Sequence, residues 1–528
     1  MSTPIRAGAP IEDLKTLAVR ASERWPDRPF LNFDETGERL SFAQFDRRSN
    51  AIGNALVSLG IKPGAKVGVM LRNCVWHPLA WVALSKIGAT MVPLNIFYKH
   101  DDASYLLAQA ECVAVITSDE FVPLLTLIAK AGGPNPMLIS IDGTGGGGTE
   151  TLPAIATDEG PTAFSTTGRH LANIQYTSGT TGKPKGCMLP NAYWLAMARK
   201  LVNTFSIGSE EVMLTAQPFY YMDPQWNVAC ALLAGCRLVA LDRFHPSSFW
   251  AKVRALDVTW FYCLGAMPTM LMKMPTDPSE RAHKVRMVMC SAIPPGLHKA
   301  LEDRWGTPWC EAFGMTETGG DLAVSLEEHD ALVGTGCIGR PLAEREARIA
   351  DEDGKALPSG EVGEMLLRGP NMMDGYYRNE AATAAAHHGE WFRTGDLARM
   401  DDEGLVYYVG RSKEMIRRSG ENISAAEVEE IIADHPSVNL AACLPVPDDL
   451  RGEEVKVYIV LQPGAQADPA TLAKHCLDRL AYFKVPRYWS FRDDLPRTPS
   501  ERIAKAVLAG EAEDLRAGAY DRVDGVWR

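Results

Sequence analysis

Short apolar runs alternate with longer amphipathic stretches through the first half of the chain. The run KVGVML (residues 66–71) predicts a buried strand, HPLAWVALSKIGA (77–89) predicts a helix, and TMVPLN (90–95) predicts the next strand. The runs AECVAVITS and CRLVALD repeat the strand pattern, each after a helical stretch. Alternation of this kind is typical of an α/β fold with largely parallel sheets.

A second pattern begins near Gly410. Ser424 and Glu427 have the spacing of a capping box, which predicts a helix that begins there. Two strand candidates, LAACLPVPD and EVKVYIVLQ, and the helical stretch DPATLAKHCLDRLA follow. Because such a stretch has the size of a compact α+β domain, we expect a large N-terminal domain (1–410) and a small C-terminal domain (411–528).

Composition and charge narrow the classes of function. The chain has 528 residues, more than one ordinary core accommodates. Its net charge of -12 and pI of about 5.5 argue against a nucleic-acid partner. We expect no integral membrane segment, because no apolar run approaches the length of about 18 residues that a span requires. The 11 cysteines form no CxxC pair, which favours reduced thiols in a cytoplasmic protein.

The stretch QYTSGTTGKPKG (175–186) has the composition of a phosphate-binding loop. It is not a Walker loop, since Thr177 stands where that motif needs glycine and Pro184 where it needs a hydroxyl residue. The backbone N–H groups and hydroxyls of such a turn can surround phosphates, and Lys183 or Lys185 can add positive charge. A polar linker of similar composition is the alternative interpretation.

This loop resembles the signature of the adenylate-forming superfamily, which includes acyl-CoA synthetases, peptide-synthetase adenylation domains and luciferases. Other segments resemble further motifs of that superfamily in the same order, namely EAFGMTETG (311–319), GEMLLRGPNMMDGYY (363–377), WFRTGDLA (391–398) and YYVGRSKEMI (407–416). The resemblance covers nearly the whole chain. It implies a large N-terminal domain of α/β layers with a β-barrel-like part, and a small mobile α+β C-terminal domain.

The resemblance also implies an ATP-dependent acid:CoA ligase with a two-step reaction. A carboxylate attacks the α-phosphate of ATP, which forms acyl-AMP and releases pyrophosphate, and the acyl group then passes to coenzyme A. Both first reactants are negative, so the enzyme must offset their repulsion and hold them in line. The implied cofactors are ATP, Mg²⁺ and coenzyme A, and the implied partner is a small or medium carboxylic acid.

The motifs assign nucleotide contacts by resemblance. Thr316 would bond phosphate, and Glu317 would hold Mg²⁺, a hard cation that prefers carboxylate oxygen. Asp396 and Arg411 would bond the ribose. The other implied nucleotide contacts are Thr177, Ser178, Gly179, Thr180, Thr181, Gly182, Lys183, Lys185, Ala292, Phe313, Gly314 and Met315. Taken singly, a Thr-Glu pair more often begins a helix and an isolated Asp more often lies in a turn; their joint order favours the binding roles.

Two further positions belong to the second step by resemblance. Lys413 matches the hinge about which the small domain of such enzymes rotates. Gly420 matches the segment beside the pantetheine tunnel, where a glycine lets a narrow ligand approach the backbone. A turn before the capped helix would equally account for Gly420.

The last motif departs from the family. The family usually has PRTxxGKIxR, whereas this chain has LPRTPSERIAKAVL (495–508), with Glu501 at the glycine and Arg502 at the lysine. Arginine can bond carboxylate and phosphate in a bidentate manner, although its reach and shape differ from those of lysine. Our hypothesis is that Arg502 is the cation of the adenylation step, and Lys505 is the alternative.

The acyl pocket is implied by the segment PFYYMDPQWN (218–227), in which Tyr221 replaces the family's histidine. Bulky side chains here disfavour a long straight acyl chain. Together Tyr221, Asp223 and Trp226 could enclose a quaternary ammonium, as the carnitine/crotonobetaine-CoA ligase branch would require. The interpretation we favour is that the aromatic residues belong to the core and Asp223 to a turn. The segments LGAMP and CSAIP would complete the pocket through Gly265 and Ile293.

Other classes of function remain open at this stage. The enzyme could load a separate carrier protein, or the departures in the last motif could mark a nucleotide-binding protein without catalysis. The resemblance allows a homodimer, and the sequence does not identify the acid.

Overall fold

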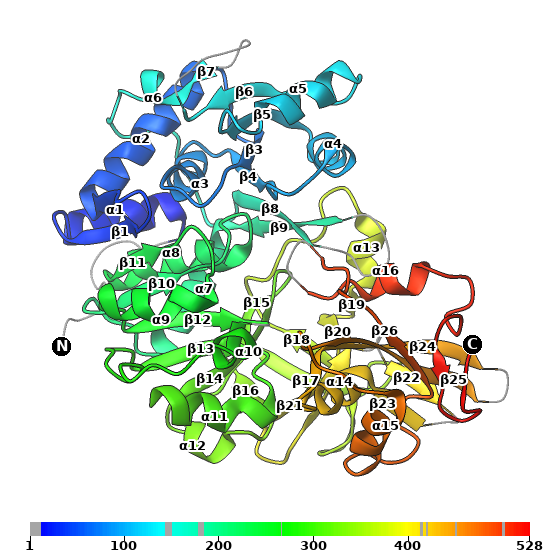
Figure 1. The fold of residues 1–528 in the computed structure, drawn as a ribbon. Helices are drawn as coiled ribbons and strands as arrows, with labels where there is room; N and C mark the ends of the chain where they lie inside the picture. Colours follow the sequence, from blue (N-terminus) through cyan, green and yellow to red (C-terminus); the bar gives the residue numbers. More distant parts are fainter. Residues whose placement is uncertain are drawn as a thin grey trace. The chain divides into compact units, whose positions relative to one another are not determined.

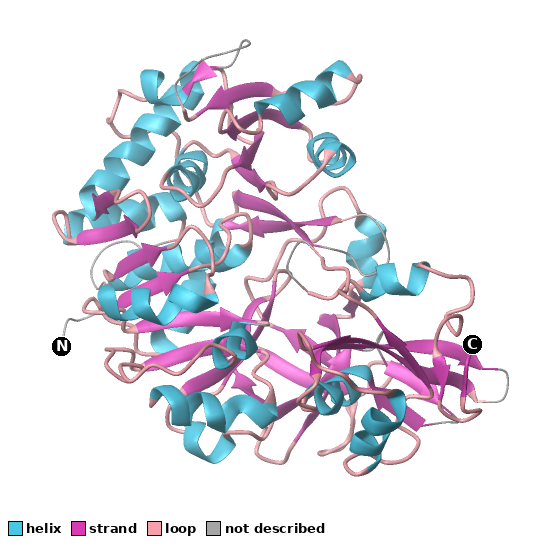
Figure 2. Ribbon diagram, viewed as in Figure 1, coloured by secondary structure: helices cyan, strands magenta, loops and turns pink. Residues whose placement is uncertain are grey.

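Helices and strands alternate along the first part of the chain, as the pattern of apolar residues predicts (Figures 1 and 2). The structure is a computed structural model. It describes residues 12–142, 150–177, 184–265, 267–411, 415–418, 421–448, 451–498 and 502–528.

The chain divides into two compact units, which are described separately. The first comprises residues 1–333, 341–346 and 369–386, and the second comprises 334–340, 347–368 and 387–528. The second unit therefore includes residues 387–410, which precede the predicted boundary. The division at Gly410 stays a prediction.

One sheet of the first unit contains seven strands, and all neighbouring strands except β8 and β9 are parallel. Their order is β7 (Glu150–Thr151), β6 (Met137–Ser140), β5 (Cys112–Thr117), β3 (Lys66–Met70), β4 (Thr90–Pro93), β8 (Leu171–Thr177) and β9 (Lys185–Pro190). The connecting helices are α3 (Trp76–Lys86), α4 (His100–Gln109) and α5 (Val122–Lys130). The predicted strand–helix–strand succession from residue 66 to residue 95 is confirmed.

The other strands of the first unit are parallel except at β2 and β15. Their order is β15 (Gly319–Ala323), β14 (Trp309–Met315), β13 (Met287–Ser291), β12 (Trp260–Leu264), β10 (Val212–Thr215), β11 (Arg237–Ala240), β1 (Pro29–Phe33) and β2 (Arg39–Ser41). The remaining helices of this unit are α1 (Leu14–Arg24), α2 (Phe42–Ser58), α6 (Leu152–Ile155), α7 (Asn191–Thr204), α8 (Met222–Ala234), α9 (Pro246–Ala255), α10 (Met267–Met272), α11 (Pro295–Trp305), α12 (His329–Leu332) and α13 (Glu380–Ala385).

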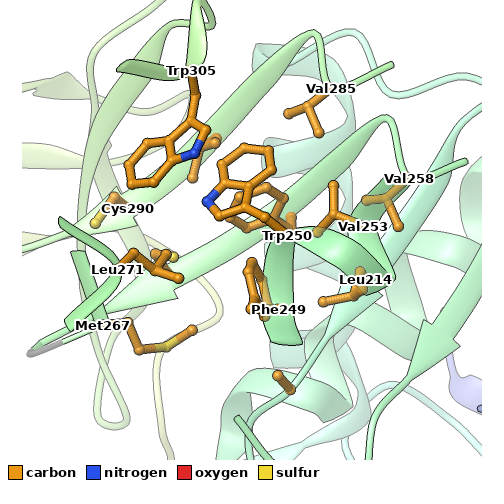
Figure 3. Close-up of a cluster of buried hydrophobic side chains, with 14 of the residues drawn as sticks. Leu214, Phe249, Trp250, Val253, Val258, Met267, Leu271, Val285, Cys290 and Trp305 are labelled. Carbon is orange, nitrogen blue, oxygen red and sulfur yellow. The ribbon is translucent and has the colours of Figure 1, made fainter. Parts of the chain in front are cut away.

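A buried aromatic cluster anchors β12, β13 and β14 (Figure 3). The rings of Trp250 and Trp305 are stacked with centroids 5.0 Å apart, and Phe261 of β12 packs edge-on against Trp250. Cys263 and Cys290 lie in the same cluster, one residue before the ends of β12 and β13. Each large buried side chain stabilises the fold by about 1.5–3 kcal/mol. The cluster therefore fixes the ends of the strands from which predicted site residues follow.

Antiparallel pairing dominates the second unit. One group of strands runs in the order β17 (Glu346–Ala350), β18 (Gly363–Arg368), β20 (Trp391–Met400), β21 (Val406–Arg411) and β16 (Cys337–Pro341), with β19 (His387–His388) paired to β20. The C-terminal sheet has the order β23 (Glu421–Ser424), β22 (Met415–Arg418), β25 (Gly452–Leu461), β26 (Tyr488–Phe491), β27 (Tyr520–Asp521) and β28 (Val526–Trp527), with β24 (Val438–Asp448) paired to β25. Its helices are α14 (Ala425–Ala433), α15 (Pro469–Leu477) and α16 (Lys505–Gly510). The α+β character predicted for the C-terminal region is confirmed.

The start of α14 confirms one half of the predicted capping box. The Ser424 hydroxyl accepts a hydrogen bond from the Glu427 N–H at 3.3 Å. The Glu427 carboxylate instead accepts hydrogen bonds of 2.7 and 2.8 Å from Lys484. The helix start is thus predictable from local sequence, whereas the partner of Glu427 comes from residues distant in the chain.

All 11 cysteines lie among the described residues and none forms a disulfide; ten of them are buried. Among the described residues, no helix combines the length and apolar character that crossing a bilayer demands.

Candidate functional site

Predicted site residues follow the carboxyl ends of three neighbouring parallel strands. Gly265 follows β12, Ala292 follows β13, and Met315 ends β14. The carboxyl ends of parallel strands lie at one edge of a sheet, where α/β proteins bind ligands. The fold thus brings together segments that are distant in the sequence.

The Ala292–Ile293 segment is held by Glu311, a residue of β14 to which the sequence assigned no role. The Glu311 carboxylate accepts the N–H of Ala292 at 2.6 Å and the N–H of Ile293 at 2.9 Å. Ala292 has a φ of +67°, which non-glycine residues seldom adopt. Burial raises the pKa of Glu311 to about 8, and the two N–H donors act in the opposite direction. The residues around Glu311 in the sequence give no sign of this contact.

Thr316 and Glu317 lie in the tight turn between β14 and β15. A Cβ atom on Gly314 would stand 2.3 Å from the Gly319 carbonyl oxygen, so the two strands require glycine there. Gly319 has a φ of +90°, which also favours glycine. This pair therefore belongs to a β-hairpin, and the alternative that it begins a helix is wrong.

The Glu317 carboxylate is buried but has a defined partner. The Tyr376 hydroxyl donates to Glu317 Oε1 at 3.0 Å, and the Met373 N–H donates to the Glu317 carbonyl at 2.9 Å. Tyr193 donates from its hydroxyl to the Thr316 carbonyl at 3.1 Å. The hairpin is thus held from α7 and from the segment that precedes α13.

Lys185 extends this group of polar residues. Its Nζ lies 4.3 Å from the centroid of the Tyr376 ring, a cation–π contact. Thr177 and Lys185 are directly paired across β8 and β9. The predicted phosphate contacts Ser178, Gly179, Thr180, Thr181, Gly182 and Lys183 lie outside the described residues.

The predicted acyl wall lies at the start of α8. Tyr221 precedes the helix, and its hydroxyl accepts a hydrogen bond from Asn95 Nδ2 at 3.3 Å. Trp226 is only 1% exposed, and its Nε1 donates to Asp223 Oδ1 at 3.4 Å. Its ring packs edge-on against Trp260 and Tyr262. Trp226 thus has the surroundings of a core aromatic residue, and its contact with a substrate stays a prediction.

The acyl wall and the phosphate motif meet within the first unit. The Thr316 hydroxyl lies 3.5 Å from Sδ of Met222, the first residue of α8. Tyr262, whose ring packs against Trp226 of the same helix, donates from its hydroxyl to Ser291 Oγ at 3.0 Å. A carboxylic acid at the start of α8 would therefore lie beside the residue predicted to contact phosphate.

The second unit brings Asp396 and Arg411 together. They are register partners in β20 and β21, and Arg411 Nε lies 2.9 Å from Asp396 Oδ1. The Asp396 side chain is 1% exposed and that of Arg411 is 33% exposed. Asp396 lies inside a strand, so the alternative that it is a turn residue is wrong.

Arg502 and Lys505 differ in their surroundings. The side chain of Arg502 is exposed, whereas Lys505 Nζ forms an ion pair of 2.8 Å with Glu429. Lys413, Gly420 and Glu501 lie outside the described residues.

Comparison with known proteins identifies the class of enzyme to which this fold belongs. The family model described as "AMP-binding enzyme" matches residues 18–377, and the model of its C-terminal domain matches residues 427–502. A sulfoacetate–CoA ligase of Cupriavidus necator is 33% identical over 94% of this chain and 97% of its own length. A crotonobetaine/carnitine–CoA ligase of Salmonella paratyphi A is 30% identical over 94% and 99%. The structure of ATP-bound MatB from Rhodopseudomonas palustris aligns with a TM-score of 0.83 at 27% identity, and covers 94% of this chain and 98% of MatB.

The chain therefore belongs to the AMP-binding enzyme family, within the adenylate-forming superfamily. It is an ATP-dependent, AMP-forming acid:CoA ligase.

Proposed function

We propose that this ligase activates a small carboxylic acid that carries a second polar group. The main support is the contact between Thr316 and Met222, because Met222 begins α8 and Thr316 is predicted to bond phosphate. Hydroxyl groups as well as apolar side chains lie around the start of α8, since Tyr221 and Tyr262, which packs against Trp226, both carry hydrogen-bonded hydroxyls. The two curated relatives are named for sulfoacetate and for crotonobetaine or carnitine, acids with a second charged group.

Each of several residues has a proposed role in the first half-reaction, the formation of acyl-AMP. Glu317 would hold Mg²⁺, since a carboxylate buried beside a Tyr hydroxyl suits a hard cation. Thr316 and Lys185 would bond the phosphates, and Phe313 would stack on the adenine. The positive side chains would offset the repulsion between the acid and ATP, so that the carboxylate reaches the α-phosphorus in line.

The ribose contact is proposed for Asp396 and Arg411. The Asp396 carboxylate can accept hydrogen bonds from two sugar hydroxyls, and Arg411 is exposed enough to donate to the same sugar. Lys413 is proposed as the hinge of the small domain and Gly420 as a neighbour of the pantetheine of coenzyme A.

Arg502 is proposed as the adenylation cation in preference to Lys505. The Lys505 ammonium is already engaged by Glu429, whereas the Arg502 side chain is exposed. Removal of one charge-stabilising donor typically costs about 10²–10³ in rate. Arg502→Ala should therefore lower acyl-AMP formation by about that factor, and Lys505→Ala should change it little. The reverse ranking would assign the step to Lys505.

A panel of acids tests the proposed substrate class. Pyrophosphate release is measured with sulfoacetate, carnitine, acetate, benzoate and octanoate, with and without coenzyme A, and thioesters are detected by mass spectrometry. We expect acyl-CoA with at least one acid that carries a second polar group, and weak turnover of octanoate. Preference for octanoate would contradict the polar-acid proposal. Pyrophosphate release without thioester formation would favour a carrier-protein acceptor, and no release with any acid would favour a nucleotide-binding protein.

The cellular setting is also part of the proposal. Mostly buried cysteines without disulfides suit a reducing compartment, so we propose that the enzyme works in the cytoplasm. We also propose a homodimer, which light scattering would test by measuring the mass of the particle in solution.

A further inference from the structure

A sealed group of charged residues lies behind the hairpin that carries Thr316 and Glu317. Arg345 Nε and Asp321 Oδ1 are 2.7 Å apart, and neither side chain has any exposed area. Lys200 of α7 adds a second buried cation. We call Lys200, Asp321 and Arg345 the buried ionic cluster.

The cluster holds the backbone immediately after Glu317. Arg345 Nη2 donates to the Thr318 carbonyl at 2.8 Å, and Lys200 Nζ donates to the Gly320 carbonyl at 3.3 Å. The Thr318 hydroxyl donates to Asp321 Oδ2. Three side-chain bonds from the cluster thus fix the far side of the turn.

The cluster also reaches the second segment that holds Glu317. Arg345 Nη1 lies 3.5 Å from the Pro370 carbonyl oxygen. Three residues later, the Met373 N–H donates to the Glu317 carbonyl at 2.9 Å. A single guanidinium therefore contacts both the hairpin that carries Glu317 and the segment whose backbone bonds Glu317.

Stability alone is a poor reason for such a cluster. Two charges lose their hydration when they are buried, and apolar residues of similar volume often serve the fold equally well or better. Burial lowers the pKa of Lys200 to about 8, which reflects that cost. What an apolar replacement cannot supply is the directed hydrogen bonds to the carbonyls of Thr318 and Gly320.

We propose that Arg345 and Asp321 are positioning residues for the adenylation step. They set the place of the Thr316 hydroxyl and the Glu317 carboxylate through the backbone of the hairpin, without touching nucleotide or acid themselves. The inference rests on the proposed function, because it takes Thr316 and Glu317 as the groups that meet phosphate and Mg²⁺.

An apolar triple variant separates positioning from stability. In Lys200→Met, Asp321→Leu and Arg345→Met together, the charges are removed and the packed volume is largely kept. We expect a thermal midpoint close to that of the wild type. We also expect the KM for Mg·ATP and the Mg²⁺ requirement to rise and kcat/KM for Mg·ATP to fall by about 10- to 100-fold, since displacement by about 1 Å has effects of that size. The KM for the acid should change by less than the KM for Mg·ATP.

The single variant Arg345→Lys tests the same proposal if the triple variant does not fold. Arg345→Lys preserves the charge but cannot donate to Asp321, Thr318 and Pro370 from one planar group. We expect a loss of about 5-fold or more in kcat/KM for Mg·ATP with little change in thermal midpoint. Wild-type kinetics in a folded triple variant, or in Arg345→Lys, would overturn the proposal.

Glu317→Gln distinguishes failure of this inference from failure of the proposed function. If Glu317→Gln loses Mg·ATP affinity and the cluster variants do not, only the positioning role is wrong. If Glu317→Gln binds Mg·ATP like the wild type, the role proposed for Glu317 is wrong, and the positioning role falls with it.

Discussion

Two Asp–Arg pairs of this enzyme are built from the same chemistry but have different surroundings. Asp321 and Arg345 in the first unit are both sealed from solvent, whereas Arg411, the partner of Asp396 in the second unit, is 33% exposed. A sealed pair can act only on the protein around it, and a pair with one exposed member can also contact a ligand. Burial, rather than residue type, therefore separates a positioning role from a binding role.

The largest expected difference between the pairs is in stability. Asp321→Asn leaves Arg345 and Lys200 buried together without a counter-charge, which should cost about 3–5 kcal/mol. Urea unfolding followed by tryptophan fluorescence measures the loss. A change below about 1 kcal/mol would mean that the sealed pair does not depend on its carboxylate.

The pair of Asp396 and Arg411, in which only Arg411 is partly exposed, should respond in the opposite way. In Asp396→Asn, Arg411 can turn toward water, so the stability loss should stay within about 1 kcal/mol. We expect kcat/KM for ATP to fall by about 10- to 100-fold, because hydrogen bonds to a charged acceptor contribute about 1.5–3 kcal/mol. Asp401→Asn, in the turn after β20, is the matched control and should leave ATP kinetics unchanged. Equal effects of Asp396→Asn and Asp401→Asn on kcat/KM for ATP would contradict the proposed contact between Asp396 and the ribose.

Glu311 extends the comparison to a buried carboxylate that accepts hydrogen bonds from two backbone N–H groups. Its folded pKa of about 8 lies above the value of an exposed glutamate, so the folded state binds the proton more tightly. Its contribution to stability is complete at low pH and is lost as the pH rises toward 8. We therefore expect the thermal midpoint to fall more between pH 6 and pH 9 in the wild type than in Glu311→Gln. Parallel pH profiles for the two proteins would contradict this assignment.

The smallest expected effect concerns the Tyr376 hydroxyl, which donates a hydrogen bond to Glu317. Tyr376→Phe removes one hydrogen bond of 3.0 Å but keeps the ring beneath Lys185. Since such a bond contributes about 0.5–1.5 kcal/mol, the Mg²⁺ concentration for half-maximal activity should rise about 2- to 10-fold. An unchanged Mg²⁺ dependence would separate Tyr376 from the metal site.

Much of the fold could be predicted from the sequence because it depends on local patterns. The strand–helix–strand succession from β3 to β4 follows from apolar runs of strand length on either side of an amphipathic stretch. The start of α14 follows from Ser424, whose side chain caps its own helix. Motif order likewise identified Thr316, Glu317 and Asp396 as candidates.

The parts that escaped prediction depend on contacts between distant segments. Nothing near Arg345 in the sequence indicates that Asp321 is its partner, because the two meet only after β15 and the segment 341–346 have folded. Glu311 has the pattern of any strand residue, and only the backbone turn at Ala292 shows what its carboxylate binds. The burial of Trp226 likewise depends on Trp260 and Tyr262, which come from a neighbouring strand.

We propose above that this enzyme makes an acyl-adenylate at the site around Glu317. Acid-dependent exchange of labelled pyrophosphate into ATP, without coenzyme A, tests it most directly because exchange requires reversible acyl-AMP formation. We expect Mg²⁺-dependent exchange with at least one small polar acid, and a loss of about 10²-fold or more in Glu317→Gln. Absence of exchange with every acid, or full exchange by Glu317→Gln, would contradict it.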